Sequence, residues 1–175
     1  MIDPNVSQNG EEFESYNIRR WGSSSWTHHL KSEGRTDGAN FVNWQWWPHT
    51  LKAHQLIHYV EQRYGVSTSE SNAAIFEHLY EQGQNVSLVE TLVKIAVQDL
   101  KVPEEEGQVL KEYLERNEGA EQVEEEIRQG RKKYNISGVP LFIIQKEDGG
   151  GRPYGLSGAQ KSSAFLEVFE ELLKE

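Results

Sequence analysis

The hydrophobic pattern of this chain changes its period near residue 138, and that change limits the folds open to it. Before that point, apolar residues recur three or four positions apart, which is typical of one face of a helix. After it, Val139–Ile144 form a continuous apolar run of strand length that contains Pro140. The loop KEDGGGRP then predicts a hairpin before a short second strand, Tyr154–Leu156. We therefore expect a block of helices, then two strands, the first of them buried, and a closing helix.

The helical block is most clearly defined after Pro48, where the apolar spacing persists for three turns and Gly65 supplies a stop signal. Ser87 and Glu90 have the spacing of a capping box, which predicts a helix start at Ser87. Further helices are expected wherever the same apolar spacing recurs, at about 11–21, 26–30, 73–80, 109–114, 123–134 and 165–172.

Composition and charge limit the classes of protein to which this chain can belong. A chain of 175 residues with 36% hydrophobic content fits one globular domain, residues 1–175. A formal net charge of −10 argues against nucleic acid or an anionic membrane as partner. Apolar runs fall far short of the ~20 residues that span a bilayer, and MIDPNVSQNG lacks the basic and apolar regions of a signal peptide. We therefore expect a cytoplasmic location and no membrane or nucleic-acid partner.

The chain contains no cysteine. This excludes disulfides, cysteine-ligated zinc, iron–sulfur clusters and a cysteine nucleophile within it. No other side-chain pattern points to a nucleophile or an acid/base pair, because the glutamate runs at 104–106 and 124–126 are typical of solvated helix faces. The sequence therefore predicts no catalytic residue.

Histidines and glycines give weak signals for a metal or a cofactor. His54 and His58 lie one helical turn apart, with His49 upstream, but no Glu or Cys completes a zinc pattern, and burial of His54 among helices is the simpler interpretation. The glycines at 149–151 lack the spacing and the following Lys of a phosphate-binding loop. We predict no metal and no cofactor.

Aromatic residues gather at 41–47, where Phe41 precedes Trp44, Trp46 and Trp47. Their faces could bind a flat ligand or a quaternary cation. The simpler interpretation is that they wedge the helical block against the rest of the domain.

Two short motifs carry a resemblance to a known family. Gly138-Val139-Pro140 before the apolar strand, followed by Ser157-Gly158-Ala159-Gln160 and a helix, is similar to the ending of the FrnE-like branch of the DsbA family. Upstream, Pro48–Leu56 resembles that branch's Pro-Asn-Thr-x-x-Ala-His-x-Leu motif, with His49 in place of Asn. The resemblance extends over nearly the whole chain.

The resemblance implies an α/β, thioredoxin-like fold of the DsbA type, with a large helical insertion at about 11–134 and a strand–strand–helix unit at about 138–175. It also implies a cis Val139–Pro140 peptide. The family consists of protein-disulfide oxidoreductases or isomerases, in which the backbone before the cis proline pairs with the substrate peptide. Val139 and Pro140 are therefore the predicted substrate-binding residues.

The family's N-terminal strand–Cys-x-x-Cys–helix–strand segment has no counterpart in this sequence. We therefore expect an N-terminally incomplete or redox-inactive form of the family, with dithiol activity absent. The strand at Leu141–Ile144 would also lack its usual neighbour, and an open apolar edge invites pairing with another chain. A protein or peptide at the proline loop or strand edge, or a second copy of the chain, is the expected partner.

Two alternatives stay open. Glutathione-dependent relatives, the kappa-class transferases and hydroxychromene-carboxylate isomerases, share the fold and the Val-Pro loop, but their endings usually differ from Ser157–Gln160. The other alternative is a non-catalytic binding or assembly subunit that uses the strand edge and the tryptophan cluster.

Overall fold

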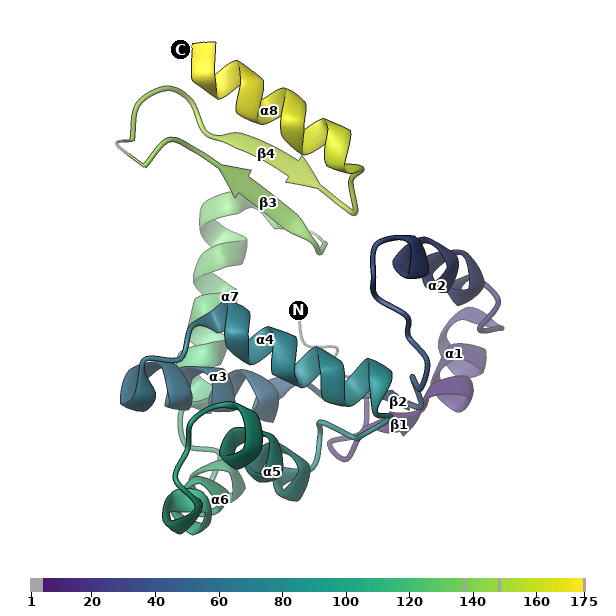
Figure 1. The fold of residues 1–175 in the computed structure, drawn as a ribbon, viewed down its shortest axis with the longest axis vertical. Coiled ribbons are helices and arrows are strands. Elements are labelled where there is room, and N and C mark those ends of the chain that lie inside the picture. Colours follow the sequence, from purple (N-terminus) through teal and green to yellow (C-terminus); the bar gives the residue numbers. More distant parts are fainter. Residues whose placement is uncertain (1–4, 137, 148, 175) are drawn as a thin grey trace. The chain divides into compact units, whose positions relative to one another are not determined.

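The computed structural model describes residues 5–136, 138–147 and 149–174, which form two compact units, 2–124 and 125–175. Figure 1 shows the elements of each unit, and each is described by itself. None of the described helices has the length and apolar character needed to cross a bilayer.

The unit at 2–124 is almost entirely helical. Its helices are α1 (Phe13–Trp21), α2 (Thr27–Thr36), α3 (Leu51–Tyr64), α4 (Thr68–Phe76), α5 (Val89–Asp99) and α6 (Gly107–Glu115), and α7 (Ala120–Tyr134) begins in it. A π-helical turn, Glu77–Glu81, continues α4, and a 3-10 turn, Glu104–Glu106, precedes α6. Most of the predicted helices are thus confirmed, including the end of α3 at Gly65, whose φ of 64° lies in the left-handed region that glycine tolerates.

The core of this unit lies where α3, α5 and α6 pack together. Leu56, Leu92, Ile95, Leu110 and Leu114 are fully buried there. Each recurs at a three- or four-residue spacing with another buried apolar residue on its own helix, so one face of every helix points inward. Burial of these faces, rather than intrinsic helix propensity, supplies most of the stability of such short helices.

One predicted helix start is wrong. Ser87 does not cap α5, because its Oγ accepts a hydrogen bond from the backbone N–H of His49, at 2.9 Å, and the helix begins at Val89. The capping box of the structure lies at α4 instead. There the Ser67 Oγ accepts from the Glu70 N–H, and the Glu70 carboxylate accepts from the Ser67 N–H, at 2.9 Å. The Ser67 N–H and the Ser67 hydroxyl both donate to the Glu70 carboxylate, and these bonds hold the pKa of Glu70 below its usual value.

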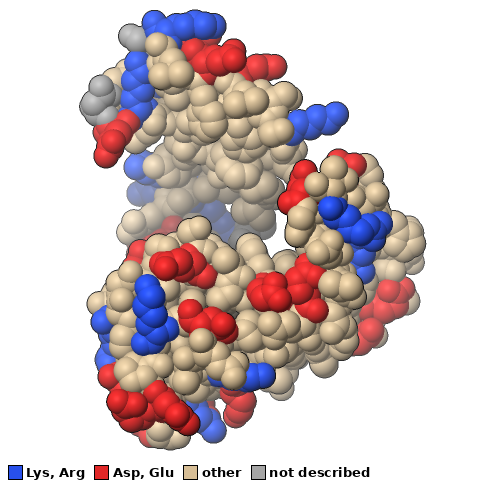
Figure 2. Space-filling view, in the orientation of Figure 1, with Lys and Arg blue, Asp and Glu red and all other residues tan. Residues whose placement is uncertain are grey.

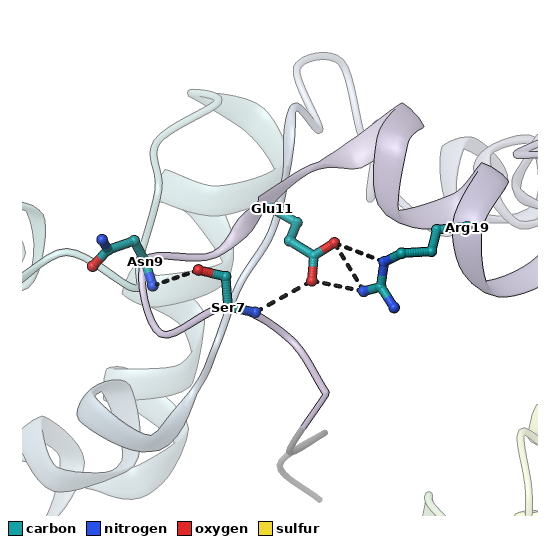
Figure 3. Close-up of polar contacts among 4 residues, drawn as sticks. All are labelled: Ser7, Asn9, Glu11 and Arg19. Carbon is teal, nitrogen blue, oxygen red and sulfur yellow. Dashed lines mark hydrogen bonds and ion pairs between the residues drawn. The ribbon is translucent and has the colours of Figure 1, made fainter.

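A two-stranded antiparallel sheet, which the sequence did not suggest, pairs the end of the aromatic segment at 41–47 with the residues just before α1. Strand β1 (Glu11–Glu12) pairs with β2 (Trp46–Trp47), with Glu11 opposite Trp47. The Glu11 carboxylate accepts two hydrogen bonds from the Arg19 guanidinium Nη2, at 2.7 and 2.8 Å, and one from the Ser7 N–H (Figure 3). The same carboxylate thus ties the chain before β1 to α1.

The unit at 125–175 contains the rest of α7, an antiparallel hairpin of β3 (Leu141–Ile144) and β4 (Tyr154–Ser157), and α8 (Ser162–Lys174). This confirms the predicted strand–strand–helix order. Helix α8 lies alongside the hairpin (Figure 1), and the Phe142 and Phe165 rings pack edge to face at 4.9 Å.

The prediction of a buried first strand is wrong. Phe142 is 36% exposed and Ile143 is 39% exposed. Phe142 faces α8, so Ile143 points to the opposite face of the sheet because strand side chains alternate. Among the described residues of this unit, only Val168 and Leu172 are buried apolar side chains, so a two-stranded sheet with one helix on it leaves much of β3 in solvent.

Candidate functional site

The candidate site is the loop that enters β3. The Val139–Pro140 peptide is cis, as predicted. The Pro140 carbonyl accepts a hydrogen bond from the Gly158 N–H, at 2.8 Å, one step beyond the Leu141–Ser157 pair of the hairpin. The two predicted motifs, Gly-Val-Pro and Ser-Gly-Ala-Gln, therefore lie side by side.

Several contacts hold the Gly158 side of this loop. Gly158 has a φ of 79°, which allows the chain to turn out of β4 towards α8. The Gln160 side-chain amide donates to the Ser157 carbonyl, at 2.7 Å. The backbone beside Pro140 is thus fixed by a turn, a ladder bond and a side-chain bond.

Val139 is 58% exposed. Within the described part of the chain, neither its N–H nor its carbonyl has a hydrogen-bond partner. Pro140 is exposed as well. The loop therefore presents one exposed residue whose main-chain groups have no partner among the described residues, beside a strand that pairs there with β4 alone.

No thiol of this chain accompanies this backbone. The chain has no cysteine. On α7, hydrogen bonds from Gln129 and Arg128 lower the pKa of the Glu125 carboxyl. This arrangement can bind a polypeptide backbone.

The histidines do not assemble a metal site. Among the described residues no group of three His, Asp or Glu side chains lies close enough to hold a metal ion. His54 and His58 are half-buried on α3, and the fully buried polar residue between them is Gln55, whose Nε2 donates to the Glu118 carbonyl at 2.7 Å. The interpretation of His54 as a residue packed among helices therefore holds in part.

A buried histidine that sequence reasoning missed is His78, in the π-helical turn. It is 4% exposed, with Nε2 at 2.8 Å from Asp99 Oδ2 and Nδ1 at 3.1 Å from Gln84 Oε1. Its partners lie 6 and 21 residues away in the sequence, so no local motif predicts these contacts. It links the end of α4 to the end of α5.

The tryptophans form part of an aromatic cluster within residues 2–124. Trp44 is buried, and Trp47 stacks on Tyr16 at 4.3 Å with the ring planes 10° apart. Trp44 also packs on Phe13, at 4.7 Å, so the cluster joins β2 to α1. Tyr80, from the predicted helix at 73–80, meets the Trp44 ring edge to face at 5.1 Å.

Comparison with known proteins supports the predicted family and fold. The model of the DSBA-like thioredoxin domain family matches residues 39–170, which include the Val139–Pro140 loop. The fold is similar to that of a crystal structure described as a probable DsbA oxidoreductase from Streptomyces coelicolor, with a TM-score of 0.79 and 20% sequence identity. The similarity covers 99% of this chain and 72% of the other. No curated protein matches the sequence.

Proposed function

Because this chain belongs to the DSBA-like thioredoxin domain family, we propose that it binds extended polypeptide segments at the Val139–Pro140 loop without dithiol chemistry of its own. The observation that carries this proposal is the open main chain of Val139. Its N–H and carbonyl have no partner in the described residues, although the backbone on the other side of Pro140 is hydrogen-bonded to Gly158.

Main-chain recognition suits this geometry. An extended peptide that runs beside Val139 accepts from its N–H and donates to its carbonyl, as a strand added to a sheet does. Such pairing uses groups that every residue except proline carries, so it tolerates many sequences. The exposed Val139 side chain adds apolar contact for a neighbouring side chain of the peptide.

The redox step of the family needs a thiolate to attack a substrate disulfide. This chain supplies none, and a serine hydroxyl is far too weakly acidic to replace it. In the proposed function the domain holds an unfolded or extended segment and leaves its disulfides unchanged.

The test compares two substitutions of one residue. Val139→Ala keeps the N–H and trims the side chain, whereas Val139→Pro removes the N–H. One lost hydrogen bond, worth about 0.5–1.5 kcal/mol, predicts that Val139→Pro binds a reduced, carboxymethylated polypeptide roughly three- to tenfold more weakly than Val139→Ala does. Circular dichroism establishes that both variants are folded, and equal affinity of the two would refute main-chain recognition.

A thiol assay separates binding from catalysis. We expect insulin reduction by dithiothreitol to proceed at the protein-free rate when this chain is added. Turnover above that rate would show a cysteine-free mechanism and overturn the proposed function.

The open edge of the hairpin supports a second role, association with another copy of the chain. Within the described residues β3 pairs only with β4, and Ile143 is 39% exposed beside that edge. Unpaired strand edges with apolar side chains are templates for pairing between chains. Analytical ultracentrifugation tests this role directly, because edge pairing makes the sedimentation coefficient depend on concentration.

A further inference from the structure

A hollow in the unit at 2–124 combines aromatic walls with acidic groups. It has a volume of about 650 Å³, within the range of small-molecule sites. It lies between the 38–44 loop and the α4–π-turn segment, with Leu30 of α2 at its rim. The side chains that matter here are Phe41, Trp44, Phe76, Tyr80, Glu77 and Glu81.

The aromatic rings meet at steep angles around Tyr80. The Phe41 ring is 5.1 Å from it at 73°, the Trp44 ring 5.1 Å at 89°, and the Phe76 ring 5.7 Å at 49°. In such packing the electron-poor edge of one ring meets the electron-rich face of the next. Phe76, which lines the hollow, is 51% exposed, so part of its ring surface is free to meet a ligand. Burial raises the pKa of Tyr80, so its phenol stays neutral near neutral pH.

The 38–44 loop is fixed in this position. The Glu81 carboxylate accepts from the N–H groups of Phe41, at 2.7 Å, and of Val42, at 3.2 Å. Phe41 has a φ of 52°, which is uncommon outside glycine, and its ring lies so close to Gly34 that a Cβ there would come within 2.4 Å of it. The walls are therefore preorganised, which lowers the entropy cost of binding.

The charge of the hollow favours a cation. Glu77 is exposed, and no hydrogen bond or ion pair engages its carboxylate among the described residues. Acidic side chains gather over the C-terminal end of α4 (Figure 2). The aromatic rings beside the hollow already contact a cation from the chain itself. Lys31 Nζ lies 5.1 Å from the Phe13 ring centre and 5.9 Å from that of Trp44.

We infer that this hollow binds an alkylated ammonium group, such as that of choline or a trimethylated lysine side chain. Such a group is attracted by aromatic faces and by a carboxylate, yet its methyl groups shed water easily enough to enter an apolar cage. An unmethylated ammonium is more strongly hydrated and gains less from the same surroundings. The residues that line this hollow all belong to the unit at 2–124 and include neither Val139 nor Pro140, so its test does not depend on the proposed function.

The experiment titrates the full chain with choline chloride at constant ionic strength, with tryptophan fluorescence and calorimetry as readouts. The control ligand is 3,3-dimethylbutanol, which has the shape of choline without its charge. Choline is expected to bind about five- to tenfold more tightly, as a cation–π contribution of about 1 kcal/mol requires. Peptides with trimethylated or unmodified lysine then separate a protein-borne ligand from a free one.

Two variants locate the site. Phe76→Ala removes a half-exposed ring and Glu77→Gln removes the charge at constant shape, and each is expected to weaken choline binding about three- to tenfold. Glu121→Gln, at an exposed position on α7, leaves it unchanged. The inference is overturned if choline binds no better than the alcohol, if neither choline nor the trimethyllysine peptide binds, or if both variants retain wild-type affinity.

Discussion

Glu81 anchors the 38–44 loop, and its removal gives the sharpest test of that local structure. Its carboxylate accepts two backbone hydrogen bonds, from Phe41 and Val42, and it holds Phe41 at a positive φ. A hydrogen bond to a charged group contributes about 1.5–3 kcal/mol when the site is well shielded. Glu81 is only half-buried and Val42 is 77% exposed, so water replaces part of each bond after truncation. We expect Glu81→Ala to lower the free energy of unfolding by about 1–3 kcal/mol in total.

The assay is urea unfolding followed by tryptophan fluorescence. All five tryptophans lie within residues 21–47, so the signal reports on the unit at 2–124 alone. A loss of this size lowers the urea midpoint by about 1 M, given a typical slope of about 1–3 kcal/mol per molar. Glu77→Ala is the matched control on the same turn, since its carboxylate has no partner in the described structure. If the Glu81 and Glu77 variants unfold at the same midpoint, the carboxylate does not anchor the loop.

Two further predictions concern a helix cap and the strand edge. Ser67→Ala removes the capping box of α4 and should cost about 0.5–2 kcal/mol, whereas Ser69→Ala, at an exposed position two residues further on, should cost much less. The folded-state pKa of Glu70 is lowered by its bonds to Ser67, so this stabilisation is present above the unfolded pKa of about 4.3 and is lost as pH falls through the folded value. Urea melts at pH 7 and pH 3 check it, and a Ser67→Ala effect that grows on acidification would contradict the sign. Ile143→Lys places a charge beside the open edge of β3 and should weaken any self-association by tenfold or more. Sedimentation equilibrium measures the association constant, and an unchanged constant would place the contact elsewhere.

The sequence was most informative where the apolar period was long and its ends were marked. Helix α3 followed from the spacing of Ala53 to Tyr64 and from Gly65, because a buried face and a left-handed stop are both local properties. The hairpin followed from the apolar run and the glycine-rich loop between β3 and β4. The family resemblance then predicted that the Gly-Val-Pro and Ser-Gly-Ala-Gln motifs would belong to one unit.

The wrong predictions concern places where contacts between residues far apart in the sequence decide the local structure. Ser87 has the spacing of a helix cap, but the His49 N–H, from a segment 38 residues away, takes its hydroxyl. The β1–β2 pair was missed because two-residue strands leave no periodic pattern, and the stacking of Tyr16 on Trp47 beside them is a contact between distant residues. The exposure of β3 was missed because an apolar run shows only that a strand can be buried. It does not show how many helices or strands pack against that strand.

The candidate site was predictable in part. The resemblance pointed to Val139 and Pro140, yet the open N–H and carbonyl of Val139 are properties of the folded backbone that no side-chain pattern encodes. The aromatic hollow was suggested by Phe41 and the tryptophans, but its other wall, from Phe76 to Glu81, comes from a segment that the sequence presents only as a helix.

The most direct test of peptide binding at the loop is an amide chemical-shift titration of the isotope-labelled chain with a reduced, carboxymethylated polypeptide. Peptide pairing at Val139 predicts that the largest shifts lie at the Val139 amide and at its neighbours in β3 and at Gly158. Saturable binding with the Val139 amide unmoved, and with the shifts confined to residues 2–124, would contradict the account.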